Sequence, residues 1–489
     1  MAKRVAVIDI GSNSARMVVY EKSSRFAFHL LHEAKSKVRL SENAYKNSGN
    51  LQALPMQRTF DTLSDFIHIA NSFKARKILC VATSALRDAP NKKDFLNKVS
   101  KELKLNIKVI EGSKEAYYGA IACANLLPLQ TNAISIDIGG GSTEFSIINE
   151  KNVTNTISLE LGTVRLKELF FDKDKIEEAT AYIDSQLERL ENFEATTIIG
   201  IGGTFRAIST AIMQQQKYPL NKLHGFECSS IDFKDFIVSI LEADEVGLSN
   251  LSIKEERFDV IKPGALILSR LLKKLTAEKI ITSGVGVREG VYLADLLRGS
   301  KDKFPANYNT SVKYLLDAYI SENNYSNQLN LISKKVFDLM HTHLNIDASY
   351  RYELGIAAKL NPIGTSIHFF SKNKHSYYLI QSALEYGFTH SQIMLIATLT
   401  KYARIKLPSN SHINKYAILL PEYKTLEALC YLLSLSIALL SHRPLNIDFE
   451  LTFDNGVLKV VPIQAGKNLY LSRESVKRLN SLTDLKVEI

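Results

Sequence analysis

The first 300 residues alternate short apolar runs with stretches of helical periodicity. The runs VAVIDI, KILCVATSA, NIKVIEG, NAISIDIGG, TTIIGIGG and EKIITSGVG are rich in β-branched residues, and each ends in small or polar residues. This alternation is typical of α/β units, in which ligands bind at loops after the carboxyl ends of strands. We therefore expect an α/β region whose functional loops gather at one edge of each sheet.

The pattern changes after about residue 300, where long helical stretches such as 311–344 begin. Near the carboxy terminus, residues 447–461 predict a β-hairpin around Asp454-Asn455-Gly456, because Asn-Gly is a strong short-range turn signal. The sequence thus predicts domains at 1–128, 129–300 and 301–489, the last mainly α-helical with a terminal β-hairpin.

Composition narrows the class of protein. The chain has 489 residues with 45% hydrophobic and 23% charged side chains, which excludes a disordered or fibrous protein. The four cysteines lie far apart without C-x-x-C spacing, so we expect no disulfide framework or zinc ribbon, and a cytoplasmic location. The apolar runs are too short for a signal peptide or a membrane span, so we expect no membrane contact.

The net charge of +10 favours an acidic partner such as a polyanionic substrate, nucleic acid or anionic lipid. The residues after 300 are the more basic part per residue. The same excess of positive charge also serves simple solubility. No nucleic-acid recognition motif is present, so we do not expect nucleic acid to be the partner.

An internal echo adds a more specific signal. The stretch IDIGSNS at 8–14 recurs as IDIGGGST at 136–143, and each copy lies between two strand-like runs. Both copies predict a β-hairpin with a turn rich in glycine and serine. The repetition implies two lobes that are built alike.

The echoed turns have the composition of phosphate-binding loops. Glycine lets the backbone approach an anion closely, and free N–H groups and hydroxyls are donors. The predicted phosphate-binding residues of these loops are Gly11, Ser12, Asn13, Ser14, Gly139, Gly140, Gly141 and Ser142. A third loop adds Gly202, Gly203 and Thr204, which lead into a helix whose N-terminus would face an anion. Each loop taken alone is equally typical of a tight turn, and no P-loop motif is present.

Taken together, the motifs resemble the exopolyphosphatase/guanosine pentaphosphate phosphohydrolase (Ppx/GppA) family. The matching stretches are DIGSNS at 9–14, ATSALR at 82–87, EGSKEA at 111–116, DIGGGSTE at 137–144, GIGGT at 200–204 and GVGVREG at 284–290. The resemblance implies an α/β fold with two duplicated actin-like (ribonuclease H-like) lobes around a cleft. A mainly α-helical HD-like module would follow them.

The resemblance assigns Glu115 as the catalytic carboxylate that orients or deprotonates the attacking water. Gly112 and Ser113 look like a turn and helix cap, which would place Glu115 in the first helical turn. There the helix dipole favours an ionised carboxylate, the form that water activation needs. An isolated glutamate at this position would only complement the dipole.

Hydrolysis of a phosphoanhydride also needs positive charge around the phosphoryl oxygens. Asp137 and Glu144 flank the second glycine loop, and we expect them, with Asp9 as a third carboxylate, to bind Mg²⁺. The competing interpretations are turn capping for the two aspartates and a solvated strand position for Glu144. Arg87 would bind phosphate as a fork, although an isolated arginine there is more often a surface charge.

Other charged residues have weaker assignments. We expect Arg165 to form an intramolecular ion pair, and Lys37 and Arg39 to lie near the cleft or to face solvent. In the helical module, Asn361-Pro362 stands where an HD-like module would carry its metal-binding pair, so we expect no second active site. The histidines His341, His343, His368 and His375 are expected to be structural or to face a polyanion.

These observations lead to one functional hypothesis with alternatives. We expect a Mg²⁺-assisted exopolyphosphatase that releases the terminal phosphate of inorganic polyphosphate and also the 5′ γ-phosphate of guanosine pentaphosphate. The resemblance further implies a homodimer. The alternatives are an enzyme that acts chiefly on guanosine pentaphosphate in the stringent response, a kinase that uses the same cleft, and a non-catalytic sensor of polyphosphate or nucleotide.

Overall fold

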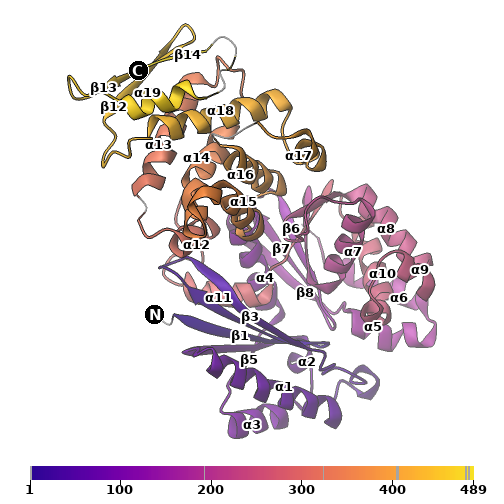
Figure 1. The fold of residues 1–489 in the computed structure, drawn as a ribbon. Coiled ribbons are helices and arrows are strands. Elements are labelled where there is room, and N and C mark those ends of the chain that lie inside the picture. The colour runs from indigo at the N-terminus through magenta and orange to yellow at the C-terminus, as the bar shows by residue number, and fades with distance from the viewer. Residues whose placement is uncertain (1–2, 192, 323, 404–406, 480–481, 483–484) are drawn as a thin grey trace. The chain divides into compact units, whose positions relative to one another are not determined.

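The computed structural model describes the chain except for residues 1–2, 192, 323, 404–406, 480–481 and 483–484. Contacts within the chain divide it into two compact units, 1–308 and 309–489 (Figure 1). The first unit contains two mixed β-sheets and the second is mainly helical. The prediction of three domains with boundaries at 128/129 and 300/301 stays a prediction.

The first sheet has the strand order β3-β2-β1-β4-β5. Its strands are β1 (Arg4–Ile10), β2 (Ala15–Lys22), β3 (Phe28–Ser36), β4 (Lys77–Ala82) and β5 (Ile107–Val109). The helices of this part are α1 (Ala53–Ser72), α2 (Ser84–Arg87) and α3 (Lys92–Leu103), with the short η1 (Tyr45–Asn47). Residues of α1 and α3 bury their apolar faces in one core with β1, β2 and β4, as burial of apolar surface requires.

The second sheet has the order β10-β11-β9-β6-β7-β8. Its strands are β6 (Ala133–Ile138), β7 (Thr143–Asn149), β8 (Asn152–Leu159), β9 (Thr197–Ile201), β10 (Phe226–Ser229) and β11 (Lys279–Thr282). Its helices are α5 (Thr163–Leu169), α6 (Ile176–Leu187), α7 (Gly202–Gln215), α8 (Ser230–Glu242), α9 (Glu245–Asn250) and α10 (Phe258–Lys274), with η2 (Phe171–Lys173) and η3 (Glu255–Arg257). These elements share a second core.

The two sheets repeat one arrangement, as the sequence echo predicts. β1 pairs antiparallel with β2 and parallel with β4, and β6 pairs antiparallel with β7 and parallel with β9. The Gly11 N–H donates to the carbonyl of Ser14 at 3.1 Å, and the Gly139 N–H donates to that of Ser142 at 2.9 Å. Both predicted hairpins are therefore confirmed, with their glycine turns closed in the same way.

Two helices are exchanged between the sheets. α4 (Gly112–Leu126) follows the first sheet in sequence but packs on β6, β7 and β8 of the second, whereas α11 (Val287–Leu296) follows the second sheet and contacts β1. The Tyr20 hydroxyl of β2 donates to the Glu289 carboxylate at 2.6 Å, which fixes α11 on the first sheet. α4 and α11 also pack against each other. The crossing ties the two sheets into one unit.

The second unit, 309–489, has its own apolar core. Its helices are α12 (Thr310–Tyr319), α13 (Asn324–Met340), α14 (Arg351–Leu360), α15 (Lys372–Ala383), α16 (His390–Tyr402), α17 (Asn410–Lys415), α18 (Tyr423–Leu439) and α19 (Tyr470–Lys477). The 3-10 turns are η4 (Ala348–Tyr350), η5 (Asn361–Ser366) and η6 (Phe369–Ser371). A small sheet of β12 (Phe449–Asp454), β13 (Val457–Pro462) and β14 (Lys486–Glu488) confirms the predicted hairpin.

Asn361 and His341, both considered in the sequence analysis, are part of the packing of this unit. Asn361 is buried, and its backbone carbonyl accepts a 2.7 Å hydrogen bond from the Ser376 hydroxyl. His341 stacks on Phe337 with ring centroids 5.1 Å apart, and its Nδ1 lies 3.2 Å from the carbonyl oxygen of Ile346. Within the described part of the chain, none of the helices is long and apolar enough to cross a membrane.

The contact between α4 and α11 depends on the absence of a side chain at Gly290. A Cβ atom there would lie 1.9 Å from the carbonyl oxygen of Tyr118 on α4, so Gly290→Ala must push the helices apart. We expect this change to lower the free energy of unfolding by about 1–3 kcal/mol. Urea denaturation measures it, with Gly299→Ala as the control, because a Cβ at Gly299 would meet no atom within 4 Å. Equal denaturation midpoints for the two variants would contradict the prediction.

Candidate active site

Glu115 lies in the first turn of α4, where the helix meets the second sheet. The helix begins at Gly112 after Glu111, and no side chain caps it, so the predicted capping role of Ser113 is wrong. A Cβ at Gly112 would lie 2.4 Å from the Cβ of Ser158 on β8, so the close approach of helix and strand requires glycine. This packing leaves Glu115 only 8% exposed.

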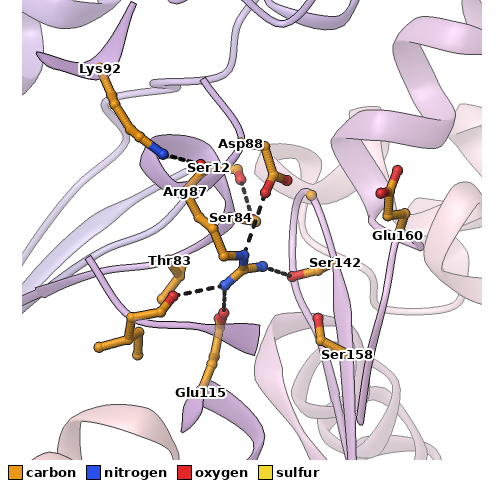
Figure 2. A network of polar contacts seen from close by, with 12 residues as sticks. Ser12, Thr83, Ser84, Arg87, Asp88, Lys92, Glu115, Ser142, Ser158 and Glu160 are labelled. Carbon is orange, nitrogen blue, oxygen red and sulfur yellow. Dashed lines mark hydrogen bonds and ion pairs between the residues drawn. The ribbon is translucent and has the colours of Figure 1, made fainter. Parts of the chain in front are cut away.

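Arg87, at the end of α2, pairs directly with Glu115 (Figure 2). Its Nη1 donates to Glu115 Oε2 at 2.9 Å and to the carbonyl of Ile110 at 3.2 Å. Its Nη2 lies 3.5 Å from the Ser142 hydroxyl of the second glycine loop. The guanidinium therefore joins the first sheet's loop to the second sheet's loop, and it is not a surface charge.

The protonation of Glu115 differs from the expectation based on the helix dipole. Burial, and next the charge of Glu144, raise the pKa of Glu115 well above its ordinary value, while Arg87 lowers it. Removal of water around a carboxylate disfavours the charged form more strongly than the dipole of one helix favours it. The ionised form of Glu115 thus depends on the cation beside it.

Three further carboxylates lie at the ends of the two hairpins. Asp137 on β6 pairs across the strands with Glu144 on β7, which is 3% exposed and accepts a 2.8 Å hydrogen bond from the Ser158 hydroxyl. Burial and the charge of Asp137 raise the pKa of Glu144 to about 7. Burial and the charge of Asp9 raise the pKa of Asp137 to about 6, against the opposing charge of Arg206. Glu144 is therefore not a solvated strand residue.

The pair Asp137 and Glu144 suits a divalent cation. Mg²⁺ is commonly bound by one or two carboxylates together with waters and substrate phosphates, and it would relieve the repulsion between these two. Asp9 is surrounded differently: burial raises its pKa, Arg288 and Arg16 lower it, and its Oδ1 atom has no hydrogen-bond partner among the described residues. Within the described ranges, no three His, Cys, Asp or Glu side chains form a group that could hold a metal ion. The role of Asp9 as a third ligand stays a prediction.

The two echoed loops touch each other. The Ser12 and Ser84 hydroxyls of the first lobe lie 3.1 Å apart. A Cβ at Gly141 of the second loop would lie 2.7 Å from the Ser84 Oγ and 2.5 Å from the Tyr45 hydroxyl. A side chain at this position would collide with the first lobe, so the second loop lies against the first lobe next to Arg87.

The third loop brings a helix end to the same place. Gly202 has a φ of +92°, and a Cβ there would lie 2.6 Å from Asp137 Oδ1, so the start of α7 lies against that carboxylate. The Thr204 side chain is 1% exposed and packs against Gly264. Its predicted contact with phosphate stays a prediction, as do the phosphate contacts of the other loop residues.

The sequence interpretation missed a set of arginines, of which Arg16 and Arg206 are close enough to act electrostatically on Asp9 and Asp137. A pocket of about 480 Å³ is lined by Arg16, Lys35, Arg206, Lys254 and Arg257, together with polar residues of α7 and of the segment 249–256. Burial, and next the charges of Arg16 and Arg288, lower the pKa of Arg206 to about 10. Such crowding of cations is favourable when an anion lies among them. One of these arginines could have been found from the sequence: in the predicted first hairpin, Arg16 lies opposite Asp9.

Three charged residues with weaker assignments, Arg165, Lys37 and Arg39, form ion pairs in the structure. Arg165 forms ion pairs with Glu160 at 2.8 Å and Asp88 at 3.2 Å, which confirms the expected intramolecular pairing. Lys37 and Arg39 each pair with Asp259 of the second lobe, at 3.7 Å and 3.6 Å. Both therefore face the opposite lobe.

Comparison with known families gives two matches along the chain. The sequence model of the Ppx/GppA phosphatase family matches residues 18–299, and that of Ppx/GppA phosphatase domain III matches residues 309–460. A bifunctional 3-dehydroquinate synthase/phosphatase of Fusobacterium nucleatum is 32% identical over 300 residues, which cover 57% of this chain and 44% of that protein. A guanosine-5′-triphosphate,3′-diphosphate pyrophosphatase of Photobacterium profundum is 27% identical over 460 residues, which cover 90% of this chain and 87% of that protein.

Solved structures agree with these matches. The Aquifex aeolicus member of the Ppx/GppA family is 27% identical, with a TM-score of 0.53 over 61% of this chain and 99% of that chain. An exopolyphosphatase from Cytophaga hutchinsonii is 25% identical, with a TM-score of 0.56 over 62% of this chain and all of the other, 100%. The expected α/β fold of two actin-like lobes followed by a helical module is confirmed.

The carboxylates of the cleft predict a pH-dependent effect of Mg²⁺ on stability. Because the pKa values of Asp137 and Glu144 are raised to about 6 and about 7, the folded protein binds more protons than the unfolded chain. Without metal, stability should be highest below their ordinary pKa values and should fall as the pH rises through 6 and 7, by about 1.4 kcal/mol per unit of pKa difference. Mg²⁺ should therefore raise the melting temperature more at pH 8 than at pH 5.5.

Scanning calorimetry with Mg²⁺ or a chelator at the two pH values measures this effect. Glu144→Gln should reduce both the pH dependence and the shift caused by Mg²⁺. Glu150→Gln, at an exposed glutamate just after β7, should leave both unchanged. An equal effect of Mg²⁺ on wild type and Glu144→Gln would exclude Glu144 as a ligand.

Proposed function

The chain belongs to the Ppx/GppA phosphatase family, and from this membership and the geometry of the cleft we propose that it hydrolyses terminal phosphoanhydride bonds of polyanionic substrates. The proposed substrates are inorganic polyphosphate, from which it removes the terminal phosphate, and guanosine pentaphosphate, from which it removes the 5′ γ-phosphate. The observation that carries the proposal is the buried Glu115 carboxylate paired with Arg87, between the glycine loops of the two lobes. The expected cytoplasmic homodimer stays a prediction.

In the proposed reaction, the backbone N–H groups of the glycine loops and the Arg87 guanidinium bind the terminal phosphoryl group. Glu115 holds a water molecule in line with the bond that breaks and takes a proton from it. The water oxygen bonds to the terminal phosphorus as the bond to the bridging oxygen breaks, and that electron pair leaves with the shortened chain. The products are inorganic phosphate and a substrate shorter by one phosphoryl group.

Mg²⁺ and Arg87 supply the positive charge in this proposal. When bound by Asp137 and Glu144, Mg²⁺ supplies positive charge to the phosphoryl oxygens. Arg87 supports the ionised form of Glu115 in the free protein, because it lowers the pKa of that carboxyl. Burial and the charge of Glu144 outweigh this effect and keep the pKa of Glu115 well above its ordinary value, so Glu115 ionises fully only with further positive charge nearby.

The arginine-lined pocket supports a polyanionic substrate. Its cations Arg16, Arg206 and Arg257 lie beside the first hairpin and the start of α7, where Gly203 would meet Arg257 Nη2 at 2.5 Å if it carried a Cβ. Phosphate groups beyond the terminal one would be neutralised there. Both polyphosphate and guanosine pentaphosphate carry such groups, so the pocket suits either.

We expect Glu115→Gln to lower kcat for phosphate release by about 10²–10⁴-fold, because the amide keeps the shape of the side chain but cannot accept the proton. Phosphate release with Mg²⁺ is measured in parallel on long-chain polyphosphate and guanosine pentaphosphate. The control is Glu111→Gln, an exposed glutamate on the same turn, which should retain wild-type rates.

The comparison of the two substrates decides between the proposed activities. Faster consumption of polyphosphate assigns the protein chiefly as an exopolyphosphatase, and faster cleavage of guanosine pentaphosphate assigns it to the turnover of that nucleotide. Wild-type rates in Glu115→Gln would overturn the role of this residue. Binding of both substrates without release from either would overturn the proposed activity and leave a sensor.

A further inference from the structure

Arg165 connects the second glycine loop to the first lobe. It lies in the first turn of α5 and is 9% exposed. Its Nε donates to the carbonyl of Gly141 at 2.9 Å, and its Nη2 donates to Asp88 Oδ2 at 3.2 Å. The guanidinium also lies over the Tyr45 ring of the first lobe, 4.8 Å from the centroid. One buried cation thus contacts the loop of one lobe and two residues of the other.

Asp88 continues this connection to the phosphate-binding arginine. It is the residue after Arg87, and its Oδ1 lies 3.4 Å from Arg87 Nε (Figure 2). One carboxylate therefore lies between two arginines, with Arg165 on one oxygen and Arg87 on the other. The Nη atoms of Arg87 remain directed at Glu115 and Ser142.

The pairing of Arg165 with Glu160 has a different character. The Glu160 side chain is 66% exposed, so this ion pair adds little stability in water. The Asp88 side chain is less exposed, at 42%, and the Nε contact is made to a backbone carbonyl, that of Gly141. The contacts of Arg165 with Gly141 and Asp88 are therefore the ones that lead toward Arg87.

We infer that Arg165 and Asp88 are positioning residues for the phosphate-binding arginine. Arg165, anchored on the Gly141 carbonyl, holds Asp88, and Asp88 holds the Nε edge of Arg87, so that its other edge faces Glu115 and the substrate phosphate. The inference rests on the proposed function, because phosphate release is the activity by which it is first measured. It goes beyond that function because neither residue touches the reacting atoms.

We expect Asp88→Asn and Arg165→Gln each to lower kcat/KM by about 10–100-fold, the size of effect that a small misplacement of a catalytic group produces. The decisive measurement is a set of double-mutant cycles. Arg165→Gln should cost almost nothing further in an Asp88→Asn or Arg87→Lys background, since its effect passes through these residues. Arg165→Lys should give an intermediate rate, because lysine cannot donate to Gly141 and Asp88 as a planar fork.

Two controls separate positioning from stability. Glu160→Gln removes the exposed partner and should keep the wild-type rate. Melting temperatures are recorded for every variant, and should Arg165→Gln fail to fold, the cycle of Asp88→Asn with Arg87→Lys replaces it, since the Asp88 side chain is 42% exposed. Additive losses in the cycles would overturn the inference and assign Arg165 to the fold alone.

A second readout separates this inference from the proposed function. Tripolyphosphate affinity, measured by calorimetry with the same variants, should show the same coupling among Arg87, Asp88 and Arg165. If the wild-type protein releases no phosphate, the proposed function fails, and coupling in binding still supports the inference. Independent effects on tripolyphosphate affinity would overturn it whether or not the protein is active.

Discussion

Burial of carboxylates in one narrow space is the constraint on which the site of the first unit depends. The four side chains Asp9, Glu115, Asp137 and Glu144 each have a pKa raised by burial, and in three of them another of the four raises it further. Such a group is stable only with cations at close range. The arginines that act on these carboxylates follow from this requirement, and so does the suitability of the site for a divalent metal and an anionic substrate.

The sequence was most informative where a function is carried by one short segment. Both hairpins and their glycine turns follow from local residue types, and the close contact with the first lobe at Gly141 explains the glycine at that position. Arg87 and Glu115 were identified through their motifs, and the structure places them 2.9 Å apart although 28 positions separate them. Family resemblance singled out the two residues separately, and their direct pairing is a contact between distant segments that the sequence did not predict.

What the sequence could not predict depends on contacts between distant segments. Arg16 lies near the start of β2, Arg206 near the start of α7 and Arg257 in η3, and no spacing rule links them. The protonation of Glu115 was misjudged for the same reason. The helix dipole can be read from the first turn of α4, but the burial of the carboxylate and its distance from Glu144 are properties of the assembled lobes.

The exchange of α4 and α11 has a consequence for how the duplicated halves can evolve. Each half contributes a helix that completes the other half's packing, and the two helices meet where Gly290 lies against Tyr118. A substitution on either helix therefore affects the packing of both sheets. The halves repeat one arrangement, but at this crossing a larger side chain on one helix requires a matching change on the other.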